Sequence, residues 1–131
     1  MRVLIGDDDL DSADNLMTLL TAAGQEMRVE ASARAGADAV ATWRPDVVLL
    51  DIALPRGGAY MVASRVRAEL AKHSARLVAL TKWGQQEDRR RSAEAGFDHH
   101  LVKPVDPLHL RVLLNAVAAD THATAGTTPK G

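Results

Sequence analysis

The sequence predicts an α/β fold, a three-layer, doubly wound domain in which helices cover both faces of a parallel five-stranded sheet. Short runs of aliphatic and β-branched residues alternate along the chain with longer stretches whose apolar residues recur every three or four positions. Successive strand–helix units of this kind require parallel strands, and the consecutive apolar residues at 47–50 are typical of a central, buried strand. The predicted strands are residues 2–5, 27–30, 46–50, 76–80 and 99–102.

The predicted helices are recognised by one apolar face and by the residues that end them. The first ends at Gly24, a residue type that commonly follows a last helical turn, and the second cannot continue past Pro45. Pro107 suits the first turn of the last helix, where its missing N–H would have no partner anyway. The predicted helices cover residues 16–23, 35–43, 60–70, 87–95 and 108–117.

Length and composition suit a single domain. The chain has 131 residues, of which 47% are hydrophobic, and this is enough for a complete core. After residue 119 the sequence becomes small, polar and aperiodic. We therefore expect one domain over residues 1–119 and a flexible tail over residues 120–131.

Charge and residue types exclude several classes of function. The 16 basic and 17 acidic residues give a net charge of −1, so there is no general attraction to nucleic acid and we expect no direct DNA binding. Because cysteine is absent, disulfides, thiolate zinc sites and cysteine nucleophiles are excluded. No apolar run approaches the roughly 20 residues that cross a bilayer, so we expect a cytoplasmic protein without a membrane partner.

Reactive side chains follow the predicted strands where each strand ends, which is where open parallel sheets bind ligands. Asp7 and Asp8 follow the first strand, Asp51 the third, Thr81 the fourth and Lys103 the fifth. Clustered carboxylates without Cys or His favour Mg²⁺, with Mn²⁺ as an alternative. A lysine and a threonine beside them suit an anion whose charge is spread over several oxygens. The pattern therefore predicts phosphoryl transfer onto an aspartate.

Each of these residues has an ordinary structural explanation when taken alone. An aspartate after a strand often caps a helix or shapes a turn, and we assign either Asp9 or Asp11, not both, as the cap of the first helix. Thr81 alone suits any strand end, and Lys103 alone could be a surface charge. The functional interpretation therefore depends on all the strand ends together.

The segments at 6–9, 48–55, 79–81 and 101–104 resemble those of the receiver domains of two-component response regulators, and the likeness covers residues 2–119. This resemblance implies a flavodoxin-like fold with strand order 2-1-3-4-5. It also implies a function. Asp51 would accept a phosphoryl group from a phosphohistidine in a Mg²⁺-dependent reaction, and the domain would then change conformation and signal through protein contacts.

The resemblance also implies a set of metal ligands. Asp8 would bind Mg²⁺ directly, and Asp7 would bind it directly or through water. Asp51 and the backbone carbonyl of Ala53 would complete the protein's share of the ligands. These roles follow from the family pattern and not from spacing alone.

The phosphoryl group would be held by residues from the last two strand ends. By the family pattern, Lys103 would pair with the acyl-phosphate oxygens, Thr81 would move in to donate a hydrogen bond, and the backbone of Lys82 would contribute as well. The resemblance further implies a cis peptide bond before Pro104 that aims the lysine inward. Only about 5% of X–Pro bonds in folded proteins are cis.

Several positions depart from the family pattern. Gly58 begins a Gly-Ala pair where Asp-Gly is common, Lys82 replaces a small residue, and the large Trp83 follows it. Because Ala53 has no side chain to orient a water and Trp83 lies where water would approach, we predict slow dephosphorylation. His100 stands where many receivers have an aromatic switch residue, and it is either a switch position or an ordinary edge-strand histidine.

Two other interpretations remain open. Phosphohydrolases of the haloacid dehalogenase type also carry Asp-x-Asp after their first strand. Here Asp7 and Asp9 would be the nucleophile and the acid, and Asp51 would have no role. The other alternative is a receiver-like scaffold that cannot be phosphorylated, with access to the site restricted by Lys82 and Trp83.

The expected partners follow from the resemblance. They are a sensor histidine kinase or histidine phosphotransfer domain and an unidentified downstream protein.

The domain would be no ordinary enzyme, because it would catalyse only its own phosphorylation and dephosphorylation. It would be a monomer or a weak homodimer through its fourth and fifth helices. A free-standing regulator, a relay intermediate and a segment of a hybrid kinase all fit, although the Met1 start and polar end suit a complete short protein slightly better.

Overall fold

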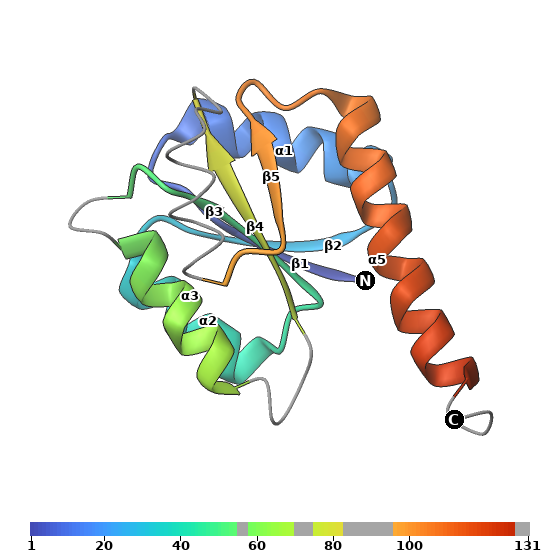
Figure 1. The fold of residues 1–131 in the computed structure, drawn as a ribbon. Coiled ribbons are helices and arrows are strands. Elements are labelled where there is room, and N and C mark those ends of the chain that lie inside the picture. Colours follow the sequence, from blue (N-terminus) through green and yellow to red (C-terminus); the bar gives the residue numbers. More distant parts are fainter. Residues whose placement is uncertain (55–57, 70–74, 83–95, 128–131) are drawn as a thin grey trace.

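The computed structural model describes residues 1–54, 58–69, 75–82 and 96–127 (Figure 1). Five parallel strands form one sheet in the order β2-β1-β3-β4-β5, which confirms the predicted fold class and strand order. The strands are β1 (Arg2–Gly6), β2 (Glu26–Glu30), β3 (Val47–Asp51), β4 (Arg76–Thr81) and β5 (His99–Val102).

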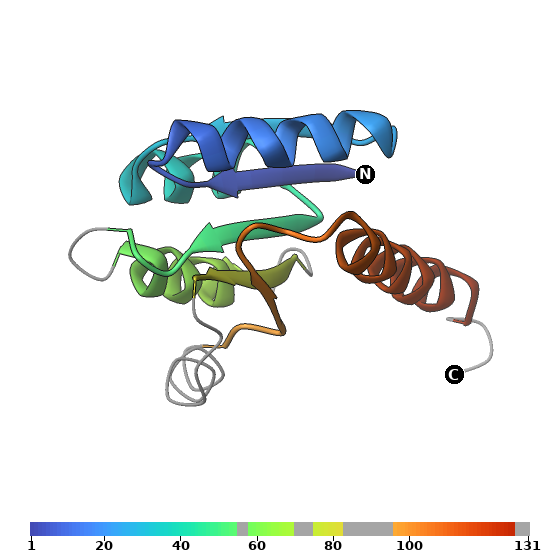
Figure 2. The ribbon, with the colours of Figure 1, turned by 90° about the horizontal axis from the view of Figure 1, so that it is seen from above.

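Four helices lie within the described residues, and together they cover both faces of the sheet. Helices α2 and α3 lie together, away from α5, in Figures 1 and 2. The fourth predicted helix, residues 87–95, lies outside the described residues. The described helices are α1 (Leu10–Ala22), α2 (Ala33–Trp43), α3 (Gly58–Glu69) and α5 (Pro107–Thr127).

The core consists of two apolar layers, one on each face of the sheet. Alternate residues of the strands point to opposite faces, so Leu4 packs with α2 and α3 while Val3 packs with α1 and α5. Strand β3 is buried along its whole length, as its run of apolar residues predicts. The central strands therefore form a rigid base from which the strand ends project.

Local chemistry explains where the helices begin. Asp9 is the N-cap of α1, because its side chain accepts hydrogen bonds from the backbone N–H groups of Asp11 and Ser12. Of the two predicted caps, Asp9 is therefore the one used. Ser32 caps α2 in the same way, through the N–H of Ala35.

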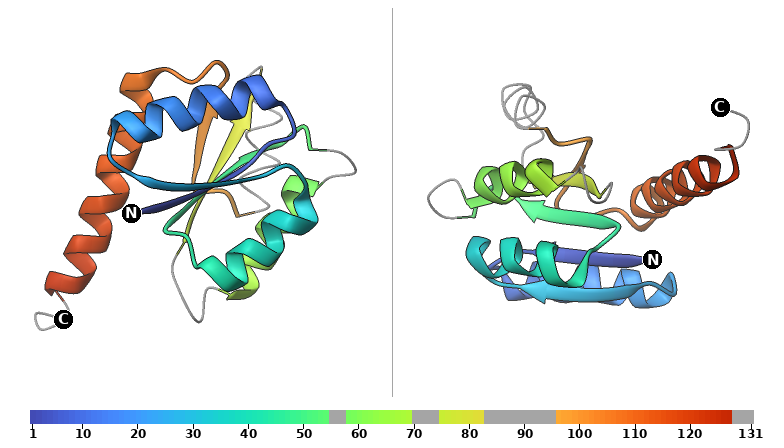
Figure 3. Two further views of the ribbon diagram at one scale, coloured as in Figure 1. Left: turned by 180° about the vertical axis from the view of Figure 1, so that it is seen from behind. Right: turned by 90° about the horizontal axis from the view of Figure 1, so that it is seen from below.

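The helix ends agree with the sequence in all but one case. Gly24 follows α1 with a φ of +75°, and α2 ends before Pro45, as predicted. The prediction that the last helix ends near residue 117 is wrong, since α5 continues to Thr127 and extends past the sheet (Figure 3). The alanines of this segment favour helix, and no proline occurs between Pro107 and Pro129. The domain boundary at 119 and the flexibility of the tail stay predictions.

Close packing of α2 against α3 explains one departure from the family pattern. A Cβ atom on Gly58 would lie only 2.6 Å from the Cβ of Ala33, so a side chain at this position would force the two helices apart.

No described helix is both long enough and apolar enough to cross a membrane.

Candidate functional site

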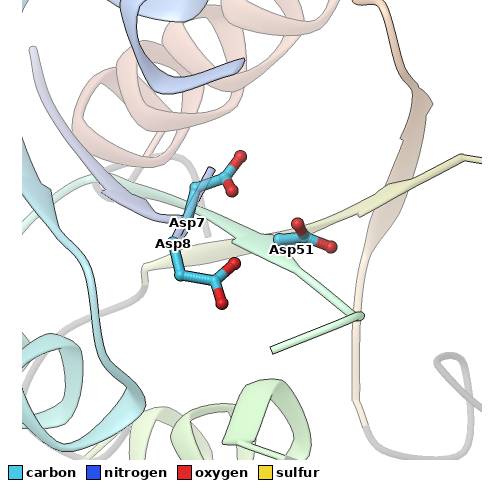
Figure 4. A group of neighbouring side chains, drawn as sticks. All are labelled: Asp7, Asp8 and Asp51. Carbon is cyan, nitrogen blue, oxygen red and sulfur yellow. The ribbon is translucent and has the colours of Figure 1, made fainter. Parts of the chain in front are cut away.

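The register of the sheet brings the predicted site residues to one edge. Gly6 lies opposite Leu50, so the next residues, Asp7 and Asp51, are neighbours at the ends of β1 and β3 (Figure 4). Thr81 lies opposite Val102 in the same way. The residue after Val102, Lys103, therefore leaves the sheet beside the end of β4.

Three polar side chains at this edge are buried, and they are the only buried polar or charged residues in the described part of the chain. Asp7 is 0% exposed, Thr81 1% and Asp51 4%. Burying a carboxylate is costly unless other groups compensate its charge. The partners of Asp7 and Asp51 are therefore central to what the site does.

Lys103 compensates both buried carboxylates at once. Its Nζ donates to Oδ2 of Asp7 at 2.7 Å and to Oδ2 of Asp51 at 2.8 Å, and its side chain is only 8% exposed. The backbone N–H of Lys103 donates to the carbonyl of Thr81 at 2.7 Å, which holds the lysine at the strand end. The peptide bond between Lys103 and Pro104 is cis, as predicted.

The other oxygens of the two buried carboxylates accept hydrogen bonds from nearby backbone groups. Oδ1 of Asp7 accepts from the N–H of Asp9 at 2.9 Å, and Oδ1 of Asp51 accepts from the N–H of Ala53 at 2.8 Å. These short-range bonds fix the two carboxylates in place before any ligand binds. Their orientation is therefore set by the loops that follow β1 and β3.

Electrostatics keeps Lys103 charged. Burial alone would lower the pKa of its ammonium group, but hydrogen bonds to Asp51 and Asp7, together with the charges of both carboxylates, raise the pKa above its ordinary value. An ammonium group that stays protonated can later donate to an anion at this position. Its charge is therefore available over the whole neutral range of pH.

The carboxylates of Asp7, Asp8 and Asp51 fit a hard divalent cation. Each offers an oxygen, and these oxygens all lie within 4.8 Å of one another (Figure 4). Asp8 is exposed, so the cluster can be reached from solvent. Among the described residues, Lys103 is the one cation paired with these three carboxylates, so the cluster keeps an excess of negative charge that a metal ion would balance. An all-oxygen donor set of this kind suits Mg²⁺ or Mn²⁺.

The remaining predicted residues have different positions. Thr81 is buried at the end of β4, whereas Lys82 and Ala53 are exposed beside the cluster. His100 is partly buried on β5, opposite Ala79 of β4. Trp83 lies outside the described residues.

One wall of the site, formed by α1, was not predicted from the sequence. An open cleft of about 380 Å³ lies beside the cluster, and Asp11, Ser12 and Asn15 line it together with Lys82 and Lys103. The spacing of Asp11 and Asn15, one helical turn apart just after the acidic cluster, could have indicated that both face the strand ends.

Sequence comparison identifies the family. The profile of the response regulator receiver domain matches residues 3–115. An uncharacterized 14.6 kDa protein of Leptolyngbya boryana is 32% identical over 110 residues, which are 84% of each chain. The DNA-binding dual master transcriptional regulator RpaA of Synechocystis is 30% identical over 105 residues, which cover 80% of this chain but only 44% of that protein. The matched segment thus spans less than half the length of that regulator.

Solved structures agree with this assignment. A response regulator of Chloroflexus aurantiacus superposes with a TM-score of 0.83 at 30% identity, covering 90% of this chain and 97% of that one. The receiver domain of a Pseudomonas aeruginosa sensor histidine kinase, which has a magnesium ion coordinated in its active-site cleft, shares the fold with a TM-score of 0.79 at 23% identity. That match covers 88% of this chain and 94% of the other. The chain therefore belongs to the receiver domain family of two-component response regulators.

Proposed function

We propose that Asp51 accepts a phosphoryl group from a phosphohistidine of a sensor histidine kinase or histidine phosphotransfer domain. The observation that carries this proposal is the buried ammonium of Lys103 between Asp7 and Asp51, with the carboxylate of Asp8 close by. Such a cluster presents a nucleophile, a cation and a set of metal ligands to the same point. Together these serve phosphoryl transfer.

The transfer changes two bonds. An oxygen of Asp51 forms a bond to phosphorus while the bond from phosphorus to the donor's imidazole nitrogen breaks, and the imidazole leaves with the electron pair. Lys103 already donates to Asp51, so its ammonium is placed to donate to the phosphoryl oxygens once they arrive. Thr81, buried at the end of the neighbouring strand, would supply a hydroxyl donor, and the backbone of Lys82 an N–H.

A divalent cation would complete the site. Asp7, Asp8, Asp51 and the carbonyl of Ala53 would hold Mg²⁺, with Mn²⁺ as a substitute, and the ion would offset the charge that develops on the phosphoryl oxygens. The domain would remain a signalling component and not a turnover enzyme, since Asp51 is consumed by each transfer.

The geometry disfavours the phosphohydrolase alternative. Asp7, its candidate nucleophile, is fully buried and held by Lys103, while Asp9, its candidate acid, caps α1 through the first backbone N–H groups of that helix. Asp51, which that mechanism leaves unused, is the second carboxylate bound by Lys103. No observation specifically favours the scaffold alternative, because every polar group that the chemistry needs is present.

The signal would pass through protein contacts in the cytoplasm. Phosphorylation would draw Thr81 toward the new phosphoryl group, and β5, which carries His100, pairs directly with the strand that ends at Thr81. An unidentified downstream protein would recognise the changed surface without direct DNA binding. The protein would act as a monomer or as a weak homodimer through its fourth and fifth helices.

Intact-protein mass tests the proposal. After incubation with acetyl phosphate and Mg²⁺, the wild type should gain the mass of one phosphoryl group, and Asp51→Asn or removal of the metal should abolish the gain. Asp46→Asn, which changes an aspartate at the start of β3 instead of its end, is the matched control and should be phosphorylated normally. A folded wild type that gains no mass from acetyl phosphate or from a phosphorylated histidine donor would disprove the proposal. Repeated hydrolysis of a phosphomonoester would support the phosphohydrolase instead.

The lifetime of the phosphorylated form is a separate proposal. Ala53 cannot orient an attacking water, and Trp83 would limit the approach of water, so we expect slow loss of the phosphoryl group. Ala53→Asn and Trp83→Ala should each shorten the half-life of the phosphorylated protein. An unchanged or longer half-life in both variants would count against this explanation.

A further inference from the structure

The cleft beside the acidic cluster has two chemically different walls. One wall is the start of α1, and the other follows the ends of β4 and β5, which lie next to each other in the sheet (Figure 1). Its volume of about 380 Å³ accommodates a small phosphorylated molecule or the phosphorylated side chain of a partner. The described residues that line it are Asp9, Asp11, Ser12, Asn15, Lys82, Lys103 and Pro104.

The charged groups of this cleft are not equally available. Lys103 is bound to Asp7 and Asp51, and the side chain of Asp9 is used to cap α1. Lys82, in contrast, is exposed and takes part in none of the ion pairs found among the described residues. Among the described residues that line the cleft, its ammonium group is therefore the cation that is free to meet an incoming anion.

The surroundings make that cation important. The exposed carboxylates of Asp8, Asp9 and Asp11 lie at the mouth of the site, and each repels an approaching phosphoryl group. A dianion is repelled about twice as strongly as a monoanion, since the energy is proportional to the product of the charges. By the same proportionality, a positive charge in the cleft attracts a dianion about twice as strongly as it attracts a monoanion.

We propose that Lys82 is a specificity-determining residue of the phosphoryl-transfer site, one that favours doubly charged phosphodonors over singly charged ones. The inference rests on the proposed function of Asp51 and adds a preference for a class of donor. Lys82 forms and breaks no covalent bond. With acetyl phosphate, the bond from Asp51 to phosphorus forms and the bond from phosphorus to the acetate oxygen breaks, and acetate leaves with the electron pair. Lys82 acts earlier, on the approach of the donor.

Two small donors that differ in charge test this role. Acetyl phosphate is a dianion near neutral pH, whereas phosphoramidate is a monoanion. The second-order rate constant of phosphorylation is measured with each donor at saturating Mg²⁺, at low and at high ionic strength. The proteins are the wild type, Lys82→Ala, Lys82→Arg and Arg111→Ala. Arg111 is the matched control because it is exposed and lines a different pocket, near the far end of α1.

The expected pattern is specific to charge. Lys82→Ala should lower the rate constant for acetyl phosphate about three- to tenfold at low salt, and the loss should shrink as salt screens the attraction. Because halving the energy takes the square root of the rate factor, the loss with phosphoramidate should be only about two- to threefold. Lys82→Arg should keep most of the wild-type rate with both donors, and Arg111→Ala should change neither.

Other outcomes separate the two proposals. If the wild type is phosphorylated but Lys82→Ala loses nothing, or loses equally with both donors at every salt concentration, the role of Lys82 is disproved while the function of Asp51 stands. If the folded wild type accepts a phosphoryl group from neither small donor, the role of Lys82 is disproved, and if a phosphorylated histidine donor fails as well, the proposed function of Asp51 fails with it.

Discussion

The two edges of the sheet use aspartate in opposite ways. At the edge where the strands begin, Asp46 accepts a hydrogen bond from the backbone N–H of Arg2 at 2.8 Å, and Asp98 accepts from the N–H of Leu77 at 2.9 Å. Asp98 also pairs with Arg67, with both side chains partly exposed. At this edge the carboxylates are solvated, and they fix the starts of neighbouring strands.

At the edge where the strands end, the balance of charge is different. Asp7 and Asp51 are buried and share one ammonium, and Asp8 adds a third carboxylate nearby. At the other edge, partly exposed aspartates hold the strand starts, so fixing a strand end does not by itself need buried carboxylates. Taking charges out of water costs free energy even when they are paired. The difference indicates that the carboxyl edge is arranged for a ligand, while the amino edge is arranged for stability.

Removing the shared cation should produce the largest effect. In metal-free buffer, Lys103→Met should lower the free energy of unfolding by about 3 kcal/mol, because Asp7 and Asp51 are then left buried without compensation. Adding Mg²⁺ should restore much of this loss, since binding stabilises the folded state by about 2.7 kcal/mol at a concentration 100 times the dissociation constant. Urea unfolding with and without Mg²⁺ measures both changes.

A second substitution sharpens this result. Asp7→Asn introduced into the Lys103→Met variant removes one of the two uncompensated carboxylates, so it should recover part of the lost stability in metal-free buffer. A loss below about 1 kcal/mol for Lys103→Met, or one that neither Mg²⁺ nor Asp7→Asn reduces, would show that the two edges do not differ as argued.

The pH dependence of stability should show a smaller effect of the same ion pairs. The pKa of Lys103 in the folded protein lies above its ordinary value of 10.5, so folding is coupled to proton binding at this group. The stabilisation it provides is fully present below the ordinary pKa and is lost as the pH rises through the raised pKa of the folded state. Metal-free wild type should therefore lose stability at high pH more steeply than Lys103→Met. Equal slopes for the two proteins in urea unfolding from about pH 9 to about pH 12 would contradict this.

Local signals in the sequence were sufficient for much of the fold and of the site. The apolar run ending at Asp51 predicts both a buried strand and the edge at which its aspartate lies, because side chains after parallel strands share one edge. The choice between Asp9 and Asp11 as the cap could not be made, since both precede suitable backbone N–H groups and only the path of the chain selects Asp9.

Contacts between distant segments could not be predicted in the same way. Lys103 reaches Asp7 across 96 positions and Asp51 across 52, and residue types alone do not show that one ammonium serves both. The extent of α5 also escaped prediction, because a polar composition after residue 119 does not prevent a helix from continuing. The contacts of Arg67 at the amino edge carry no sequence signal, since arginines on helices are usually solvated.

Substitution of Arg67 tests the contrast between the two edges with the smallest expected change in stability. From α3 its side chain donates to the carbonyl of Gly96 and to Asp98, the residues that precede β5. Partly exposed contacts of this kind contribute little, so Arg67→Met should lower the free energy of unfolding by about 1 kcal/mol. Arg65→Met, which changes an exposed arginine of the same helix, is the control and should cost less.

The same variant should leave the chemistry of the opposite edge unchanged. Arg67 lies at the amino edge, so Arg67→Met should bind Mg²⁺ and accept a phosphoryl group from acetyl phosphate as the wild type does. Urea unfolding and mass measurements on one sample test both halves of this expectation. A loss of phosphorylation in a stable Arg67→Met protein would mean that the contacts before β5 help to position Lys103 at its far end. The two edges would then be coupled through that strand and not independent of each other.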